Sequence, residues 1–186
     1  MQKKTMDELG RKTIDEIKQT EKNAIIVILD GIRSMHNVGS VFRTCDAFAI
    51  QELYLCEFTP LPPHRDIHKT ALGATETVKW KHIELTLEAL KLAKSKGYKV
   101  FAVEQAHNSI SLENCATNID KIALIFGNEV TGVNDEILHH VDGCIEIPQW
   151  GNKHSLNISV SVGVVLWEFV RYRNEKNNDK NGCVTN

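Results

Sequence analysis

The chain has 186 residues and a mass of 21.0 kDa, a length that suits one globular domain with a substantial core. Its hydrophobic content of 42% and charged content of 25% are typical of a folded globular protein and argue against a disordered or membrane-embedded one. The formal net charge of −2 gives no basic character, which lowers the expectation of nucleic-acid binding without excluding a local basic patch.

The first half of the chain alternates predicted helices and strands. The β-branched run AIIVILD at 24–30 predicts a strand buried on both faces. Asn37 is predicted to cap a helix that ends near Ala49. The remaining predicted elements are a polar helix at 5–22, a strand at 52–57, a proline-rich loop at 58–66, a short helix at 69–74, a strand at 77–81 and an amphipathic helix at 83–97.

In the second half, one long apolar segment is ambiguous. From Leu156 to Val164, apolar residues alternate with small or polar ones, which is the pattern of a strand. The apolar run continues to Val170, which is too long for a typical strand, so we expect a helix from Ser155 that is buried against the sheet and a second surface. The other predicted elements are strands at 98–104, 121–127 and 142–148 and helices at 111–115 and 133–141.

Strands that alternate with helices predict an α/β protein with a mostly parallel sheet flanked by helices. We divide the chain into an N-terminal helical extension (1–24), one α/β domain (25–173) and a polar, frayed tail (174–186). The five cysteines form no CxxC pair, which predicts reduced thiols and no metal site. No apolar signal region and no run of ~20 apolar residues is found, so we expect a cytoplasmic protein without a membrane partner.

Three predicted strands are each followed by a polar or glycine-containing loop and then a helix. In a parallel sheet such loops lie at the carboxyl ends of the strands, where α/β proteins bind their ligands. The first loop follows Asp30, the second starts at Gly127 and the third starts at Gln149. None contains GxGxxG, GxxxxGK[ST] or GxSxG, which argues against a dinucleotide site, a P-loop and a serine hydrolase.

Taken one at a time, the polar residues of these loops have ordinary explanations. Arg43 lies opposite the apolar stripe of its predicted helix, where contact with solvent is the default. Asn37 and Ser155 are plausible caps, and Glu129 is a loop carboxylate. Asn157 is less ordinary, because an amide one turn into an apolar helix needs hydrogen-bond partners.

Taken together, the three loops resemble the three motifs of the SpoU-type RNA 2′-O-ribose methyltransferases of the SPOUT superfamily. The motifs are NVGSVFRT at 37–44, FGNEVTG at 126–132 and IPQWGNKHSLNISVSVGVVLWE at 147–168. Each motif is weak alone, but their order and spacing fit the family. The resemblance covers roughly residues 25–168.

The resemblance implies a C-terminal deep trefoil knot, a homodimer built on the last helix, and S-adenosylmethionine as the methyl donor. Such knots are rare, and periodicity alone would not have suggested one. The positions that match the family's cofactor contacts are Gly127, Ile147 and Leu156, with Val103 or Glu104 as a further contributor.

The catalytic residues implied by the resemblance are Asn37, Arg43, Glu129, Ser155 and Asn157. The reaction is an in-line attack of a ribose 2′-hydroxyl on the activated methyl group. Arg43, supplied across the dimer, is expected to bind the adjacent phosphate and stabilise the developing alkoxide. A literal base role conflicts with a guanidinium pKa above ~12.

Only about 24 residues precede the first predicted strand, as in the compact tRNA (guanosine-2′-O)-methyltransferases of this family. We therefore expect a tRNA substrate, with rRNA as the second choice and a knotted RNA-binding module without catalysis as the alternative. Residues 1–22 carry six Lys or Arg against five Asp or Glu, which does not predict strong phosphate binding. Gln149 and Trp150 depart from the motif, and Trp150 could stack on a base.

Overall fold

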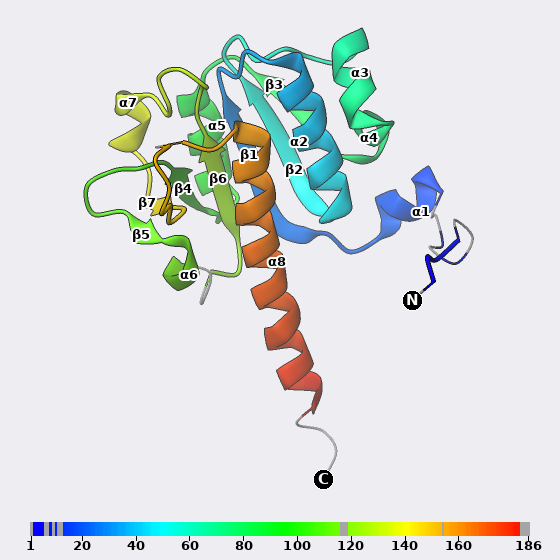
Figure 1. Cartoon of the computed structure of the whole chain (residues 1–186). Coiled ribbons are helices and arrows are strands. Elements are labelled where there is room, and N and C mark those ends of the chain that lie inside the picture. Colours follow the sequence, from blue (N-terminus) through cyan, green and yellow to red (C-terminus); the bar gives the residue numbers. More distant parts are fainter. Residues whose placement is uncertain are drawn as a thin grey trace.

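A sheet of seven strands forms the centre of the molecule. The computed structural model describes residues 2–5, 8, 10, 13–115, 119–153 and 155–182, with side chains to residue 176. The strands are β1 (Asn23–Asp30), β2 (Ile50–Cys56), β3 (Trp80–Ile83), β4 (Lys99–Val103), β5 (Ile110–Ser111), β6 (Ile122–Phe126) and β7 (Gly143–Glu146). Their spatial order is β3-β2-β1-β6-β4-β7-β5, and all neighbouring pairs are parallel (Figure 1). The predicted α/β class with a parallel sheet is therefore confirmed.

Helices cover both faces of the sheet (Figure 1). They are α1 (Ile14–Gln19), α2 (Met35–Ala47), α3 (Arg65–Ala71), α4 (Ala74–Thr77), α5 (Thr86–Ser95), α6 (Leu112–Cys115), α7 (Asp135–Leu138) and α8 (Ile158–Gly182). One hydrophobic core lies between the sheet and α2, α3, α4, α6 and α8, and a second lies between the sheet and α5 and α7. The central strand β1 supplies both cores in alternation, which explains why its sequence is apolar at nearly every position.

The long apolar segment near the C-terminus is a helix, so the strand alternative is wrong. Val162, Val165, Leu166 and Phe169 are buried, at the spacing of one helical face. The helix starts at Ile158, three residues later than expected, and the polar stretch from 174 continues it to Gly182. Residues 183–186 lie outside the described residues. No helix in the described part of the chain is long and apolar enough to cross a membrane.

Several boundaries differ from the predictions. The helix expected at 5–22 is reduced to α1, which begins after a capping box formed by Thr13 and Glu16, while the described residues before Thr13 are not helical. The helix expected at 69–74 is α3, which begins earlier, and the strand expected at 77–81 is β3, which begins at Trp80 after the short helix α4. The two-residue strand β5 was not predicted, because two residues carry no periodicity.

The first motif's glycine sets the distance between α2 and α3. A Cβ atom at Gly39 would collide with the backbone oxygen of Ile67 and the hydroxyl of Thr70. The Thr70 hydroxyl also donates to the His36 carbonyl at 3.0 Å. Glycine is therefore required by the close approach of the two helices, and this contact positions the start of α2 at the sheet edge where the strands end.

A nearly buried carboxylate links β2, β3 and α5 on the face covered by α5. Glu52 is 4% exposed and accepts from Tyr54 at 2.7 Å and from Lys96 at 2.8 Å. Lys79 and Lys81 lie 3.3 and 3.5 Å from the same group. Burial acts to raise the pKa of Glu52, but the hydrogen bonds and the lysine charges lower it to about 2.

Glu52→Gln should lower the free energy of unfolding near neutral pH by about 2 kcal/mol, because Lys96 and Tyr54 lose a charged acceptor. A carboxyl whose folded-state pKa is lowered stabilises the fold above its ordinary pKa of 4.5, and this contribution is lost as the pH falls toward 2. Urea unfolding should show the difference between wild type and variant shrinking over that range. Glu88→Gln, an exposed change on α5, is the control. A difference that does not depend on pH would contradict the role given to the charge.

Candidate active site

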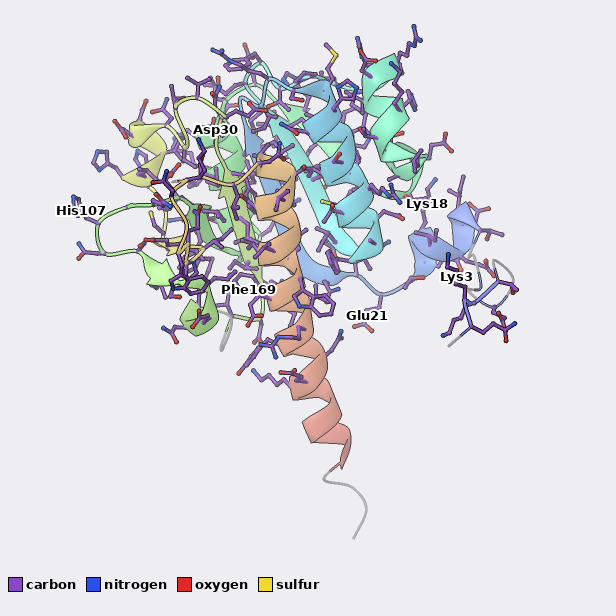
Figure 2. The ribbon with its side chains drawn as sticks, viewed as in Figure 1. Lys3, Lys18, Glu21, Asp30, His107 and Phe169 are labelled. Carbon is purple, nitrogen blue, oxygen red and sulfur yellow. The ribbon has the colours of Figure 1, made fainter. Side chains whose placement is uncertain are left out.

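The candidate site lies at the edge of the sheet where the parallel strands end. Three loops meet there: residues 31–34 after β1, residues 127–134 after β6 and residues 147–157 after β7. Figure 2 shows Asp30, the last residue of β1, at this edge, whereas Lys18 and Glu21 lie on the N-terminal segment away from it. The predicted convergence of the three loops is therefore found.

The Glu129 carboxylate joins the second loop to the first. Its Oε2 accepts the backbone N–H of Arg33 at 3.0 Å, and its Oε1 accepts that of Ser34 at 3.3 Å. Oε1 also accepts the side-chain amide of Asn37 at 2.9 Å. Asn157 extends the network to the third loop, since its Nδ2 donates to Asn37 Oδ1 at 3.2 Å. Glu129, Asn37 and Asn157 thus form one chain of hydrogen bonds across all three loops.

The charge state of Glu129 follows from these donors. Partial desolvation acts to raise the pKa of its carboxyl, but the N–H groups of Arg33, Asn37 and Ser34 outweigh it and lower the pKa below the ordinary value. The group is therefore ionised at neutral pH. Because both oxygens already accept hydrogen bonds, Glu129 is suited to hold its neighbours in place rather than to remove a proton.

The prediction that Asn37 caps its helix is wrong. Ser34 is the N-cap of α2, and its hydroxyl accepts the backbone N–H of Asn37 at 3.2 Å. Asn37 is the third residue of the helix, and its side chain turns to Glu129. Both residue types are good caps, so local sequence could not decide between them.

The third loop differs in a similar way. Asn157 precedes α8 instead of lying inside it, and its Oδ1 accepts the backbone N–H of Ser159 at 2.9 Å. Asn157 therefore closes the start of α8 with one amide atom and reaches Asn37 with the other. Ser155, predicted to begin the helix, is an exposed residue of the loop.

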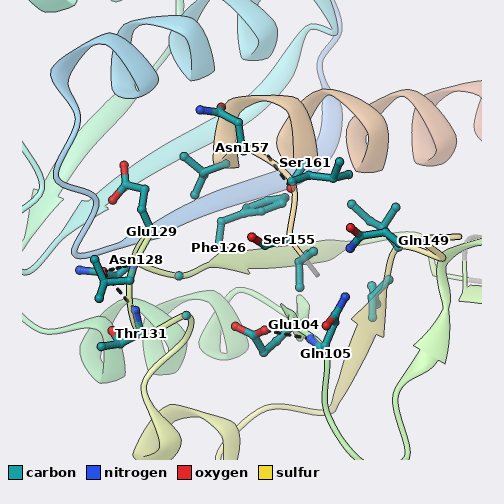
Figure 3. Close-up of a pocket in the computed structure, with 18 residues that line it drawn as sticks. Glu104, Gln105, Phe126, Asn128, Glu129, Thr131, Gln149, Ser155, Asn157 and Ser161 are labelled. Atoms are coloured by element: carbon teal, nitrogen blue, oxygen red, sulfur yellow. Dashed lines mark hydrogen bonds between the residues drawn. The ribbon is translucent and has the colours of Figure 1, made fainter. Parts of the chain in front are cut away.

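A pocket of about 570 Å³ opens beside this network (Figure 3). A volume of this size is typical of small-molecule sites. Its wall combines apolar side chains, such as Phe126 and Ile145, with polar loop residues. Every residue predicted to contact a cofactor lines it, as do three predicted catalytic residues: Val103, Glu104, Gly127, Ile147 and Leu156, together with Glu129, Ser155 and Asn157.

Two close contacts shape the second loop around the pocket. A Cβ atom at Gly127 would collide with the backbone of Gly132 and Val133, so the chain can double back there only with glycine. Glu104 fixes the far side of the loop, because its Oε2 accepts the backbone N–H of Val133 at 3.0 Å. Glu104 accepts the N–H of Gln105 with its other oxygen, at 2.9 Å. Gly127 and Glu104 therefore act on the shape of the pocket wall.

Among the described residues, Arg43 is the predicted site residue that belongs neither to the pocket wall nor to the hydrogen-bond network of Glu129, Asn37 and Asn157. It is exposed on α2, as the helical wheel indicated, and it is not part of the pocket wall within the described residues. It lies six residues after Asn37 on the same helix, a rise of about 9 Å. The single chain therefore does not bring Arg43 to its own pocket, and its supply across a dimer stays a prediction.

Asn128 contributes to the site but was not predicted individually. Its Nδ2 donates to the Gly31 carbonyl at 2.9 Å, and its Oδ1 accepts the N–H of Val130 at 2.8 Å. This is a local turn made by an asparagine side chain, combined with a long-range tie to the first loop. The asparagine just before Glu129 was a usable turn signal, but the partner in the first loop could not be read from sequence. Other pocket residues that were not predicted are Gln105, Thr131, Gln149 and Ser161.

The fold and site define an α/β protein with a ligand pocket bounded by the segments that follow β4, β6 and β7. The chain belongs to the SpoU rRNA methylase family, whose model matches residues 24–167. The resemblance of the three motifs to this family is thereby confirmed.

Relatives carry names for two RNA substrates. The chain is 30% identical to a tRNA (guanosine(18)-2′-O)-methyltransferase of Aquifex aeolicus, over 89% of this chain and 77% of that one. It is 31% identical to the 23S rRNA (guanosine-2′-O-)-methyltransferase RlmB of Neisseria meningitidis serogroup B, over 88% of this chain and 64% of that one. The solved A. aeolicus TrmH/SpoU tRNA modifying enzyme superposes with a TM-score of 0.78 at 27% identity, covering 88% of this chain and 82% of the other.

Glu129→Ala should increase the amide hydrogen-exchange rates of Arg33 and Ser34 by about tenfold, because their N–H groups lose a charged acceptor. Glu129→Gln, which keeps one carbonyl oxygen, should have a smaller effect. Val130→Ala is the matched control, since this neighbouring side chain is 70% exposed and has no hydrogen-bonding group. Unchanged exchange in Glu129→Ala would contradict the network.

Proposed function

We propose that this protein is an S-adenosylmethionine-dependent RNA 2′-O-ribose methyltransferase that acts on tRNA. The observation that carries the proposal is the hydrogen-bonded set Glu129, Asn37 and Asn157, of which Glu129 and Asn157 line the pocket. These are the residues that the family resemblance assigns to catalysis, and they come from three loops far apart in the sequence. A protein that only binds RNA has no need for this arrangement beside a small-molecule pocket.

The pocket suits S-adenosylmethionine, the methyl donor of this family. When bound, this cofactor supplies an electrophilic methyl group. The pocket offers apolar surface from Val103, Ile147 and Leu156 for a flat base, and a backbone turn at Gly127 for polar groups. The turn is close-packed and held by Glu104, so the pocket is formed before any ligand enters.

The chain's own residues position the ribose and stabilise charge. Glu129 holds Asn37, and Asn37 holds Asn157, so the two amide groups are fixed in orientation beside the pocket. The attacking 2′-hydroxyl develops negative charge, which a guanidinium stabilises well. We assign this role to Arg43, which also binds a phosphate next to the reactive ribose. Ser155 lies on the pocket wall, where it can contact the same ribose.

Arg43 reaches the active site of a second copy in this proposal, because it does not reach that of its own chain. The exposed face of α8 supports a homodimer: Val160, Val164 and Trp167 are 50%, 38% and 57% exposed, and they leave an apolar face uncovered. Burying this face against a partner removes apolar surface from water. The all-round apolar character of the helix then has a physical reason.

We also propose the knot and the domain division of this family for the chain. Residues 103–105 and 127–132 line one pocket together with residues 145, 147, 149 and 155–158, which is the arrangement expected when the last segment passes between two earlier loops. The α/β domain then spans 25–173, with 1–24 as an extension. Pulling the protein from residues near both ends of this domain should leave an extended chain shorter than its full contour length, because a tightened knot retains several residues.

tRNA is favoured over rRNA because the similarity to the A. aeolicus tRNA enzyme extends over most of both chains. Methyl transfer from labelled S-adenosylmethionine to bulk tRNA and to rRNA, followed by mapping of alkali-resistant dinucleotides, tests the substrate. Methyl transfer to rRNA but not to tRNA would show that rRNA is the substrate. Cofactor binding without methyl transfer to either RNA would favour the alternative, an RNA-binding module without catalysis.

Arg43→Ala should lower methyl transfer by about 100-fold or more, while cofactor affinity changes little. Mixing this inactive variant with inactive Glu129→Ala, under conditions that exchange subunits, should restore about a quarter of the wild-type activity. Mixed dimers of a two-fold symmetric enzyme then contain one site with both residues intact. If Arg43 acts within its own chain, no mixed dimer contains an intact site and no activity returns.

Val160→Glu should convert the dimer to monomers and abolish methyl transfer, because it places a charge in the apolar face of α8. Analytical ultracentrifugation gives the oligomeric state, and circular dichroism confirms that the helix is retained. Leu72→Glu, at a residue that is 67% exposed at the end of α3, is the control and should remain dimeric. A dimeric Val160→Glu variant would contradict the assigned interface.

A further inference from the structure

Trp150 is the most exposed large hydrophobic residue in the described part of the chain. Its relative exposure is 89%, compared with 70% for Val130 and 67% for Leu72. Tryptophan buries more apolar area than any other residue type, so leaving one almost entirely in water is unfavourable. An exposed tryptophan of this kind points to a ligand or a partner that covers it.

Other exposed aromatic side chains have contacts within the chain. The ring of Phe58 lies close to the backbone of Gly31, and the ring of Trp167 lies 6.2 Å from that of Phe48. Trp167 also belongs to the apolar face of α8 assigned to the dimer. Among the described residues, Trp150 takes part in no ring–ring or cation–ring contact of this kind.

Trp150 belongs to the loop that walls the pocket. Its neighbour Gln149 lines the pocket, and Ser155 lines it from the other end of the same loop (Figure 3). Trp150 itself is not part of the pocket wall. The indole is therefore exposed on a loop that contributes to the pocket wall, but it lies outside the wall itself.

The charge around the site fits a polyanion. The segments 31–45, 127–133 and 147–157 contain three cations, Arg33, Arg43 and Lys153, against the single carboxylate of Glu129. That carboxylate already accepts three N–H groups. Glu104 adds a second carboxylate on the pocket wall, and it too already accepts N–H groups, those of Val133 and Gln105. Positive charge beside an exposed aromatic ring is the composition that binds single-stranded nucleic acid.

We infer that Trp150 stacks on a nucleobase of the RNA, adjacent to the nucleotide whose ribose is methylated; this inference rests on the proposed function. Stacking needs an unpaired, splayed-out base, so the target lies in a loop or a distorted helix of the RNA. Every base presents a π face, so the contact adds affinity without reading base identity. Trp150 is a positioning residue and touches no reacting atom.

Trp150→Ala should raise the KM for RNA by about 5- to 100-fold, the range that stacking of one base contributes. The affinity for S-adenosylmethionine and the value of kcat at saturating RNA should stay close to wild type. Trp150→Phe keeps an aromatic ring and should restore most of the RNA affinity. Leu72→Ala, which removes an exposed apolar side chain outside the site, is the matched control and should leave the KM unchanged.

Tryptophan fluorescence gives a readout that a purely structural role would not produce. Stacking should quench the emission of wild type when RNA is added, and the quenching should be lost in Trp150→Phe while RNA still binds. An unchanged KM in Trp150→Ala would overturn the inference, and so would a loss of cofactor affinity or of the dimer in that variant. If wild type transfers no methyl group to any RNA, the proposed function is wrong. If wild type and Trp150→Ala both methylate RNA and have the same KM, only the stacking role of Trp150 is wrong.

Discussion

The architecture of the site depends on how acidic and amide side chains at the strand ends satisfy backbone N–H groups of other loops. Glu129 accepts from residues 33 and 34, Glu104 accepts from Val133, and Asp30 accepts the N–H of Asn134 at 3.2 Å. Each bond links segments that are distant in sequence. Loops at a sheet edge lack ladder hydrogen bonds, so such bonds are what give them one conformation.

Because the carboxylates of the site already accept backbone N–H groups, they are poorly suited to act as general bases. A carboxylate whose oxygens hold two loops together has little capacity to take a proton from a substrate hydroxyl, and its lowered pKa makes it a weak base. Glu104 is occupied in the same way by Val133 and Gln105. Positioning and charge stabilisation are therefore the contributions left to these loops, which agrees with the role proposed for Arg43.

The sequence predicted the elements well and their ends poorly, for physical reasons. The strands of the central sheet are buried on both faces, and continuous β-branched runs such as residues 24–30 report that burial directly. The start of α2 was missed because Ser34 and Asn37 are both good caps, and a partner 92 residues away decides which one caps. Glu129 and Asn157 could be selected as site residues only because the three motifs occur together. The hydrogen bonds from Asn157 to Asn37 and from Asn128 to Gly31 join segments that are distant in sequence, so no local pattern predicts them.

Three features of the single chain remain exposed to solvent although the proposed function gives each of them a partner. A single chain provides a preformed pocket and a fixed hydrogen-bond network, yet Arg43, Trp150 and the outer face of α8 all face solvent. Solvent exposure is unremarkable for an arginine, but it is unfavourable for an indole and for a row of valines on a helix. In the proposed dimer a second copy covers the helix and supplies the guanidinium, whereas in the proposed RNA complex a base covers the indole. These two proposals have opposite consequences: the dimer would complete every site, while the stacked base would be present only during substrate binding, so Trp150 would have to stay exposed in the free enzyme.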